Sequence, residues 1–89
     1  MKILLTPTFA RQVKKLHNNQ KKDLDRAVDG ICIDPLIGEM KKGDLAGIRV
    51  YTFKMVGQLT LLAYQVENNE LLMLLMLGLH ENFYKDLKK

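Results

Sequence analysis

The spacing of apolar residues changes once along this chain, from a helical period before residue 34 to a period of two after residue 45. Thr6-Pro7 predicts the start of a first helix, because threonine caps helices and proline is favoured in their first turn. A second helix is predicted from about Gln20 to Ile33. It ends at Asp34-Pro35, since the residue before a proline avoids helical geometry. The short link predicts an antiparallel helical hairpin.

The second half of the chain predicts an antiparallel meander of three strands. Residues 50–54 alternate, a turn at Gly57-Gln58 follows, and the next strand covers 59–66. After a turn with two asparagines, residues 71–77 are apolar on both faces, as expected for a central strand. A first strand over 2–5 and a short basic C-terminal helix complete the pattern. The fold class is therefore α+β, in the order β-α-α-β-β-β, with a helical hairpin on one face of an antiparallel sheet.

The length of 89 residues predicts a single domain covering residues 1–89. The net charge of +4 weakly favours a polyanionic partner such as RNA, DNA or the ribosome, with simple solubility as the alternative explanation. The single cysteine, Cys32, fits a reducing compartment. Residues 1–5 are too short for a signal peptide and 71–79 too short for a membrane span, so a cytoplasmic protein without a membrane partner is expected.

Four stretches, in this order and spacing, resemble the RelE/ParE superfamily of bacterial toxins. The first is the opening helix at residues 9–16, and the second is Asp34-Pro35 followed by residues 45–51. The third is Leu62-Ala63-Tyr64, and the fourth is the ending at residues 77–84. The resemblance covers nearly the whole chain. It implies the toxin component of a type II toxin–antitoxin system, with a cognate antitoxin as partner and operator DNA bound only through the antitoxin complex.

The superfamily offers two activities. RelE-like members cut messenger RNA in the ribosomal A site, without a metal or cofactor, and so inhibit translation. ParE-like members inhibit DNA gyrase and are not nucleases. The residues favour the mRNA endonuclease, with the gyrase inhibitor as the alternative. A decayed toxin that acts mainly in an antitoxin–DNA repressor complex is a third possibility.

Metal-free RNA cleavage needs groups that move two protons and a cation that meets the charge building on the phosphate. The resemblance implies that His80, directly after the last strand, transfers a proton, and that Lys54 stabilises the phosphate. Tyr84 would stack on a base or orient the phosphate, Glu81 would orient His80, and Arg49 would bind phosphate. A surface histidine, an edge-strand lysine, a packed tail tyrosine and a helix-start glutamate are the structural alternatives. Arg49 stands two positions before Tyr51 and so shares its face of the strand. This argues against a place for Arg49 on the open face of the sheet.

Further lysines are candidate contacts to RNA, with solvated charge as the ordinary alternative. Those in the central loop and the tail are Lys41, Lys42, Lys85, Lys88 and Lys89. A second basic surface on the helical hairpin would consist of Lys14, Lys15, Lys21, Lys22 and Arg26.

One position departs from the RelE-like pattern. Those nucleases usually carry an arginine just before the strand motif at residues 62–64, and this chain has Leu61 there. Such a cation contributes several kcal/mol to transition-state stabilisation, so its loss favours compensation elsewhere, a weak nuclease or a different target. The stripe Leu59, Leu61 and Ala63 would instead suit a docked antitoxin segment.

Overall fold

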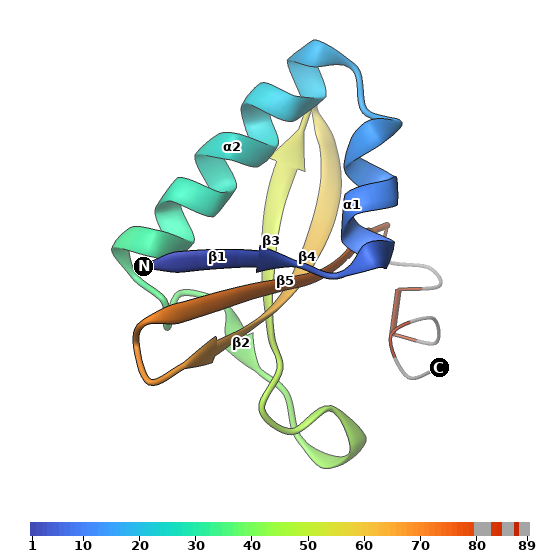
Figure 1. The fold of residues 1–89 in the computed structure, drawn as a ribbon. Coiled ribbons are helices and arrows are strands. Elements are labelled where there is room, and N and C mark those ends of the chain that lie inside the picture. Colours follow the sequence, from blue (N-terminus) through green and yellow to red (C-terminus); the bar gives the residue numbers. More distant parts are fainter. Residues whose placement is uncertain (80–82, 85–86, 88–89) are drawn as a thin grey trace.

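The order of elements follows the sequence prediction, with one added short strand. The computed structural model describes residues 1–79, 83, 84 and 87. Its elements are β1 (Lys2–Leu5), α1 (Pro7–Lys14), α2 (Asn18–Ile33), β2 (Glu39–Met40), a 3-10 turn (Gly43–Leu45), β3 (Arg49–Met55), β4 (Gln58–Glu67) and β5 (Leu71–Gly78). Figure 1 shows β1 at the start of the chain, then the two helices, then the other strands of the twisted sheet. Of the predicted C-terminal helix, Phe83, Tyr84 and Leu87 have helical backbone.

The five strands form one sheet in the order β1-β5-β4-β3-β2. The meander predicted for the second half of the chain is confirmed, because β3, β4 and β5 pair antiparallel. Strand β1 runs parallel to β5, which the pattern did not predict. The whole of the intervening chain joins these two strands, so no hairpin turn dictates their relative direction. In this order β5 lies between β1 and β4, which agrees with the interior position that its apolar composition predicted. Among the described residues, no helix is long and apolar enough to cross a membrane.

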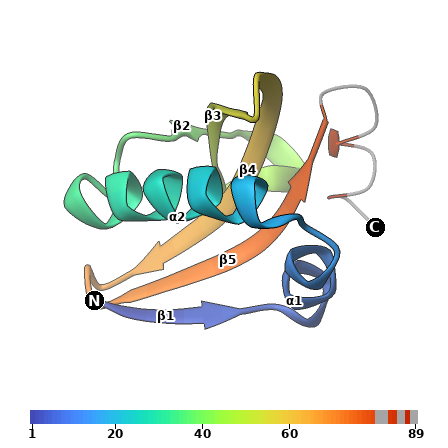
Figure 2. The ribbon, with the colours of Figure 1, turned by 90° about the horizontal axis from the view of Figure 1, so that it is seen from above.

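Both helices lie on the same face of the sheet (Figure 2), α1 against β5 and β1, and α2 against β3. The first helix begins as predicted, since the hydroxyl of Thr6 accepts a hydrogen bond of 3.1 Å from the Phe9 amide. The side chains buried between helices and sheet are Phe9, Leu24, Ile31, Leu62, Tyr64, Leu72, Leu74 and Leu77.

A β-bulge in β5 gives the opposite face a core of its own. Ala63 pairs with Met76 and Tyr64 with Leu74, so Leu75 has no partner in β4. The extra residue reverses the alternation along β5 and turns Met76 away from the helices. A second buried cluster results, and it consists of Val50, Leu61, Ala63, Met76 and Phe83. The face that carries these residues, opposite the helices, is called the tail face below.

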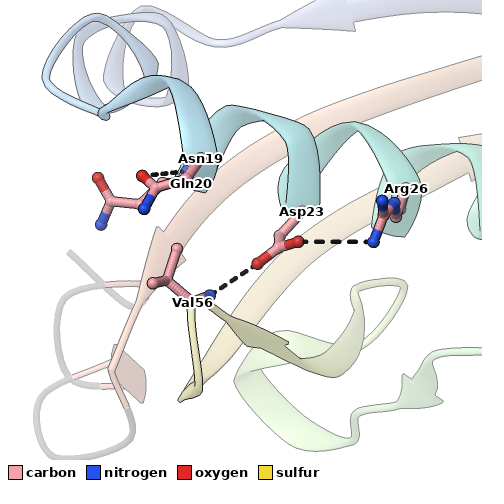
Figure 3. Close-up of polar contacts among 5 residues, drawn as sticks. All are labelled: Asn19, Gln20, Asp23, Arg26 and Val56. Atoms are coloured by element: carbon pink, nitrogen blue, oxygen red, sulfur yellow. Dashed lines mark hydrogen bonds and ion pairs between the residues drawn. The ribbon is translucent and has the colours of Figure 1, made fainter.

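The turn between β3 and β4 holds a β-branched residue in a conformation that favours glycine. Val56 has φ 52° and Gly57 φ 77°, and the flanking Met55 and Gln58 pair directly. Figure 3 shows how α2 secures this turn: the Asp23 carboxylate accepts a 2.7 Å hydrogen bond from the Val56 amide. The other carboxylate oxygen lies 3.9 Å from Arg26. The turn is therefore strained at Val56 and fixed by a contact from the helix layer.

Replacing Val56 with asparagine is expected to stabilise the protein by about 1 kcal/mol, because asparagine tolerates positive φ far better than valine. A gain of this size raises the melting temperature of a domain this small by roughly 5 °C. Thermal unfolding followed by circular dichroism measures it. Val56→Thr is the matched control, since threonine is polar but still β-branched. Equal stabilisation by both variants would show that polarity, and not backbone strain, limits this turn.

Candidate functional site

A charged and aromatic cluster lies where β2 meets the C-terminal segment. Glu39 is on β2, and Lys41 directly follows that strand, with its amide bonded to the Ile48 carbonyl at 2.9 Å. The Lys41 ammonium is 3.3 Å from a Glu39 carboxylate oxygen and 5.1 Å from the centroid of the Tyr84 ring. Tyr84 meets Phe83 edge to face, with centroids 5.4 Å apart. Lys41 and Tyr84, named separately by the sequence, are thus neighbours in space.

The contacts of Lys41 keep it charged. A hydrogen bond with the Tyr84 side chain, and more weakly the Glu39 carboxylate, raise the pKa of Lys41 above its ordinary value and outweigh the opposing effect of burial. The stabilising contribution of these contacts is present below the ordinary lysine pKa. It disappears as the pH rises through the higher pKa of the folded state. A lysine is charged at neutral pH in any case, and these contacts hold its ammonium beside the aromatic ring.

The loop before β2 is held by Tyr64, which is fully buried. The Tyr64 hydroxyl donates to the Pro35 carbonyl at 2.8 Å and accepts from the Gly38 amide at 2.8 Å. A Cβ at Gly38 would come within 2.6 Å of that hydroxyl, so only glycine fits beside it. Burial raises the pKa of Tyr64, so the phenol stays protonated and able to donate.

Arg49 holds the same loop, because its guanidinium donates to the carbonyls of Gly38 at 2.8 Å and Leu36 at 3.3 Å. The hydrogen bonds of Tyr64 and Arg49 to this loop are together called the loop clamp. The parity argument is confirmed, since Arg49 lies opposite Tyr64 in β4, away from the tail face. The guanidinium of Arg49, which was predicted to bind phosphate, is thus hydrogen-bonded to the loop backbone. Together Tyr64 and Arg49 determine where β2 begins, and with it the position of Lys41.

Removing the Tyr64 hydroxyl is expected to lower the free energy of unfolding by about 1–3 kcal/mol, because Tyr64→Phe leaves a buried amide without its acceptor. Urea denaturation measures the loss. The control is Tyr51→Phe, since Tyr51 is only half-buried and no hydrogen bond of its hydroxyl is among those of the described residues. A loss no larger than that of the control would contradict the clamp.

Lys54 lies on the tail face but at the other end of β3. It is exposed and pairs with Leu59, and Thr52 pairs with Leu61. At about 3.3 Å per residue, Lys54 is roughly 20 Å along the strand from Ile48, beside which Lys41 lies. Leu61 also pairs with Gly78, so the end of β5 is aligned with this half of β3. The described part of the tail face therefore carries one lysine at each end of β3.

The apolar stripe expected to receive an antitoxin is largely covered by the chain itself. Leu59 is 53% exposed, but Leu61 is 3% and Ala63 0% exposed. Phe83 covers them, packed in the same buried cluster with Val50 and Met76. The expectation of an open stripe is therefore wrong for Leu61 and Ala63. The reason is a contact with a residue about 20 positions later in the chain, which the strand pattern does not contain.

Several predicted residues lie outside the part of the chain that the structure describes. They are His80, Glu81, Lys85, Lys88 and Lys89. Lys42 is described and exposed. In the described ranges, no group of three His, Cys, Asp or Glu side chains is placed to hold a metal ion.

Two features of the described structure were missed by the sequence reasoning. The first is the ion pair between Glu39 and Lys41, because the sequence groups these two residues with Lys42 in one charged loop but does not show which of them pair. The second is a groove of about 470 Å³ between β1, α1 and α2, with an apolar floor and two carboxylates, Asp25 and Asp29, among its lining residues. This groove is on the helix face and does not include the cluster of Lys41 and Tyr84.

Solved structures with the same fold include three of an E. coli toxin. The intact E. coli RelBE toxin–antitoxin complex matches with a TM-score of 0.71 at 16% identity, over 90% of this chain and 96% of that chain. An E. coli RelE variant with two arginines changed to alanine, in complex with a RelB antitoxin peptide, matches at 0.70 and 16% identity, over 99% and 94%. The isolated E. coli RelE toxin matches at 0.69 and 15% identity, over 98% and 95%.

The comparison of sequences agrees with this fold. None of the curated proteins matches the chain. A family model does match, over residues 3–88, and it describes the ParE-like toxins of type II bacterial toxin–antitoxin systems. The match covers every described helix and strand except the first residue of β1. The chain therefore belongs to the ParE-like toxin family of type II bacterial toxin–antitoxin systems.

Proposed function

We propose that this toxin arrests translation by cleaving messenger RNA on the ribosome, without a metal ion. The observation that carries the proposal is the position of the Lys41 ammonium, 5.1 Å from the centroid of the Tyr84 ring, beside the tail face. An ammonium attracts a phosphate, and the face of a tyrosine ring stacks on a base, so the pair suits one nucleotide of a single strand. Lys54 adds a second exposed cation on the same face.

Each step of the proposed cleavage is assigned to a residue whose functional group can perform it. Attack of a ribose 2′-hydroxyl on the adjacent phosphate forms a cyclic phosphate and expels the 5′-oxygen, so one proton leaves and another arrives. His80 has the side chain suited to transfer these protons near neutral pH, with Glu81 to orient it. Lys54, on the half of β3 that is aligned with the end of β5, would stabilise the charge on the oxygens of the phosphate that is cut. Lys41, roughly 20 Å away along β3, would bind another phosphate of the same strand. Lys42, Lys85, Lys88 and Lys89 would contact the ribosomal or messenger RNA backbone.

A cognate antitoxin is proposed as the protein partner. The E. coli RelBE complex and the RelE–RelB peptide complex are toxins bound to antitoxins, and they share the fold of this chain. Of the stripe expected to receive the antitoxin, Leu59 is exposed and so available for a first contact. Operator DNA would be bound through the antitoxin complex, in the cytoplasm.

The test is cleavage by the purified toxin, freed of antitoxin, on translating ribosomes. Primer extension should map new mRNA ends at the codon in the A site. Absence of A-site ends at excess toxin would reject the proposed function. Ends that appear on naked RNA at the same rate would reject the dependence on the ribosome.

Gyrase inhibition is the second candidate, and a specific observation favours it. The middle of the tail face carries Thr52, Leu61 and Ala63, so the described residues place no cation between Lys41 and Lys54. A non-catalytic inhibitor needs no such cation. A supercoiling assay with purified gyrase separates the two functions: inhibition at stoichiometric toxin, without mRNA cleavage, would replace the nuclease with the inhibitor.

A further inference from the structure

The two edges of the sheet differ in how they are protected from pairing with another chain. One edge is β2, which has two residues and carries the charged Glu39, with Lys41 directly after it. The other edge is β1, which Figure 2 shows at the lower border of the sheet. Edge strands usually carry charges that discourage pairing, but β1 is apolar after Lys2, and Ile3, Leu4 and Leu5 are 40–49% exposed.

The backbone groups on the outer side of β1 belong to Ile3 and Leu5. The amides of Lys2 and Thr6 donate hydrogen bonds of 2.8 and 3.1 Å towards the β5 side. Successive residues of a strand point their backbone groups to opposite sides, so the N–H and C=O groups of Ile3 and Leu5 point away from the sheet. Among the strands that the structure describes, β1 pairs only with β5. Two donors and two acceptors are therefore available at this edge.

The side chains of β1 are apolar on both faces of the sheet. Ile3 and Leu5 line the groove of about 470 Å³ between β1, α1 and α2, so they lie on the helix face. Leu4, between them, projects from the opposite face. A strand added beside β1 would cover part of all three side chains while it satisfied the backbone groups. Both features are typical of an edge that accepts another strand.

This edge is complementary to a second copy of itself in the antiparallel direction. When Leu4 lies opposite the Leu4 of the second copy, Ile3 of each copy faces Leu5 of the other. Each of these two pairs exchanges two hydrogen bonds, so all four outward groups acquire partners. The two Leu4 residues form the pair without hydrogen bonds, in which the Cα atoms are about 4.5 Å apart and the side chains lie closest. The arrangement has a twofold axis and is closed at two copies.

The charge of β1 favours the same direction. Lys2 is the only charged side chain among residues 1–10. In the antiparallel register the two lysines lie four residues apart, or roughly 14 Å along the strands, which exceeds the screening length of about 8 Å at physiological salt. A parallel arrangement in register would place them side by side on neighbouring strands, about 5 Å apart. Repulsion between the lysines therefore disfavours the parallel dimer.

We propose that a second copy of this chain binds antiparallel along β1, so that the two sheets join into one. The contact is small, because a standard interface has about 20–30 residues on each side and β1 offers four with their immediate neighbours. The dimer is therefore weak, with a dissociation constant on the order of 10–100 µM. This association does not depend on the proposed function, since none of the residues assigned to cleavage lies on β1.

Sedimentation equilibrium of the purified, antitoxin-free protein from about 1 µM to about 1 mM tests the proposal. The average mass should rise with concentration from that of one chain towards that of two. Leu4→Lys should raise the dissociation constant at least tenfold, because two ammonium groups would then meet at the twofold axis. The long stem of lysine covers apolar surface as leucine does, and circular dichroism verifies that the fold is kept.

The matched control is Leu36→Lys, which adds the same charge in the loop before β2, at the opposite edge of the sheet. Leu36 is 64% exposed. This variant should change the dissociation constant less than threefold. Equal weakening by the two variants would overturn the proposal, because net charge would then explain the loss.

Cross-linking tests the register directly. Leu4→Cys, made together with Cys32→Ala so that one thiol remains, should form a disulfide-linked dimer when oxidised by air, because a Cα separation of about 4.5 Å suits a disulfide. Ile3→Cys in the same background is the control. Its two copies would lie two residues out of register, with Cα atoms roughly 8 Å apart, which is too far for a disulfide.

The outcomes separate the proposal from its alternatives. Cross-linking at position 4 without cross-linking at position 3 would support the antiparallel dimer. Equal cross-linking at both positions would overturn it. A protein that remains a single chain at every concentration would also overturn it and would leave β1 to an extended segment of another protein. Cleavage of mRNA on ribosomes by a protein without self-association would uphold the proposed function and reject the dimer.

Discussion

Replacing Phe83 with alanine is expected to lower the free energy of unfolding by about 3–4 kcal/mol. Its ring is only 2% exposed and is packed against the cluster of the tail face. The ring also occupies the space that Gly78 leaves, since a Cβ at that glycine would lie 2.8 Å from a ring carbon. Removal opens a cavity over Leu61 and Ala63 that the surrounding strands, paired on both sides, cannot close. Urea denaturation followed by circular dichroism measures the loss.

Globular proteins have a free energy of unfolding of about 5–15 kcal/mol. The expected loss is therefore a large part of the stability of so small a domain. Leu79→Ala is the control, because Leu79 comes from the same end of β5 but is 50% exposed. It should cost about 0.5 kcal/mol or less. If Phe83→Ala cost no more than Leu79→Ala, the C-terminal segment would not be a stable cover of the tail face in solution.

The elements that the sequence predicted correctly are those whose signals are local. The cap at Thr6, the proline after it and the Asp34-Pro35 terminus each act within one turn of the helix concerned. The two asparagines between β4 and β5 have φ of 52° and 57°, as their turn position required. Val56 shows the limit of this reasoning. Its left-handed conformation is imposed by the strand pairing on either side, against the preference of the residue itself.

The faces of the sheet were predictable only as far as strict alternation holds. Parity placed Tyr51 towards the helices and Lys54 on the opposite face, and the register of β3 agrees. In β5 the bulge at Leu75 reverses the alternation, and a strand apolar on both faces contains no signal of it. The burial of Leu61 and Ala63 under Phe83 was missed for a related reason: it depends on how a tail folds back over a sheet.

The candidate site was predictable by residue type but not by contact. Lys41 and Tyr84 were both named, one as a loop cation and one as a tail aromatic, and 43 positions separate them in the chain. Their proximity depends on β2, a strand of two residues that extends the sheet at β3. That strand is positioned in turn by Tyr64 and Arg49 acting on the preceding loop. These hydrogen bonds join residues far apart in the chain, so the spacing of residue types in the sequence does not reveal them.

Replacing His80 with alanine is expected to reduce the rate of ribosome-dependent mRNA cleavage by about 10²–10⁴-fold. The physical reason is the loss of the proton-transferring group, which lysine and tyrosine side chains replace poorly near neutral pH. Primer extension with a time course of cleavage measures the rate. Affinity for the cognate antitoxin should be unchanged, because a single proton-transfer group contributes little apolar surface to a protein interface.

His17→Ala is the matched control, since the chain has two histidines and His17 is exposed at the start of α2. It should leave the cleavage rate within about twofold, because the imidazole of His17 is assigned no proton transfer in the proposed reaction. A His80→Ala toxin that cleaves as fast as the His17→Ala toxin would assign His80 to a structural role. Proton transfer would then have to come from Tyr84 or Lys54, and the corresponding Tyr84→Phe and Lys54→Met variants would show which of them carries it.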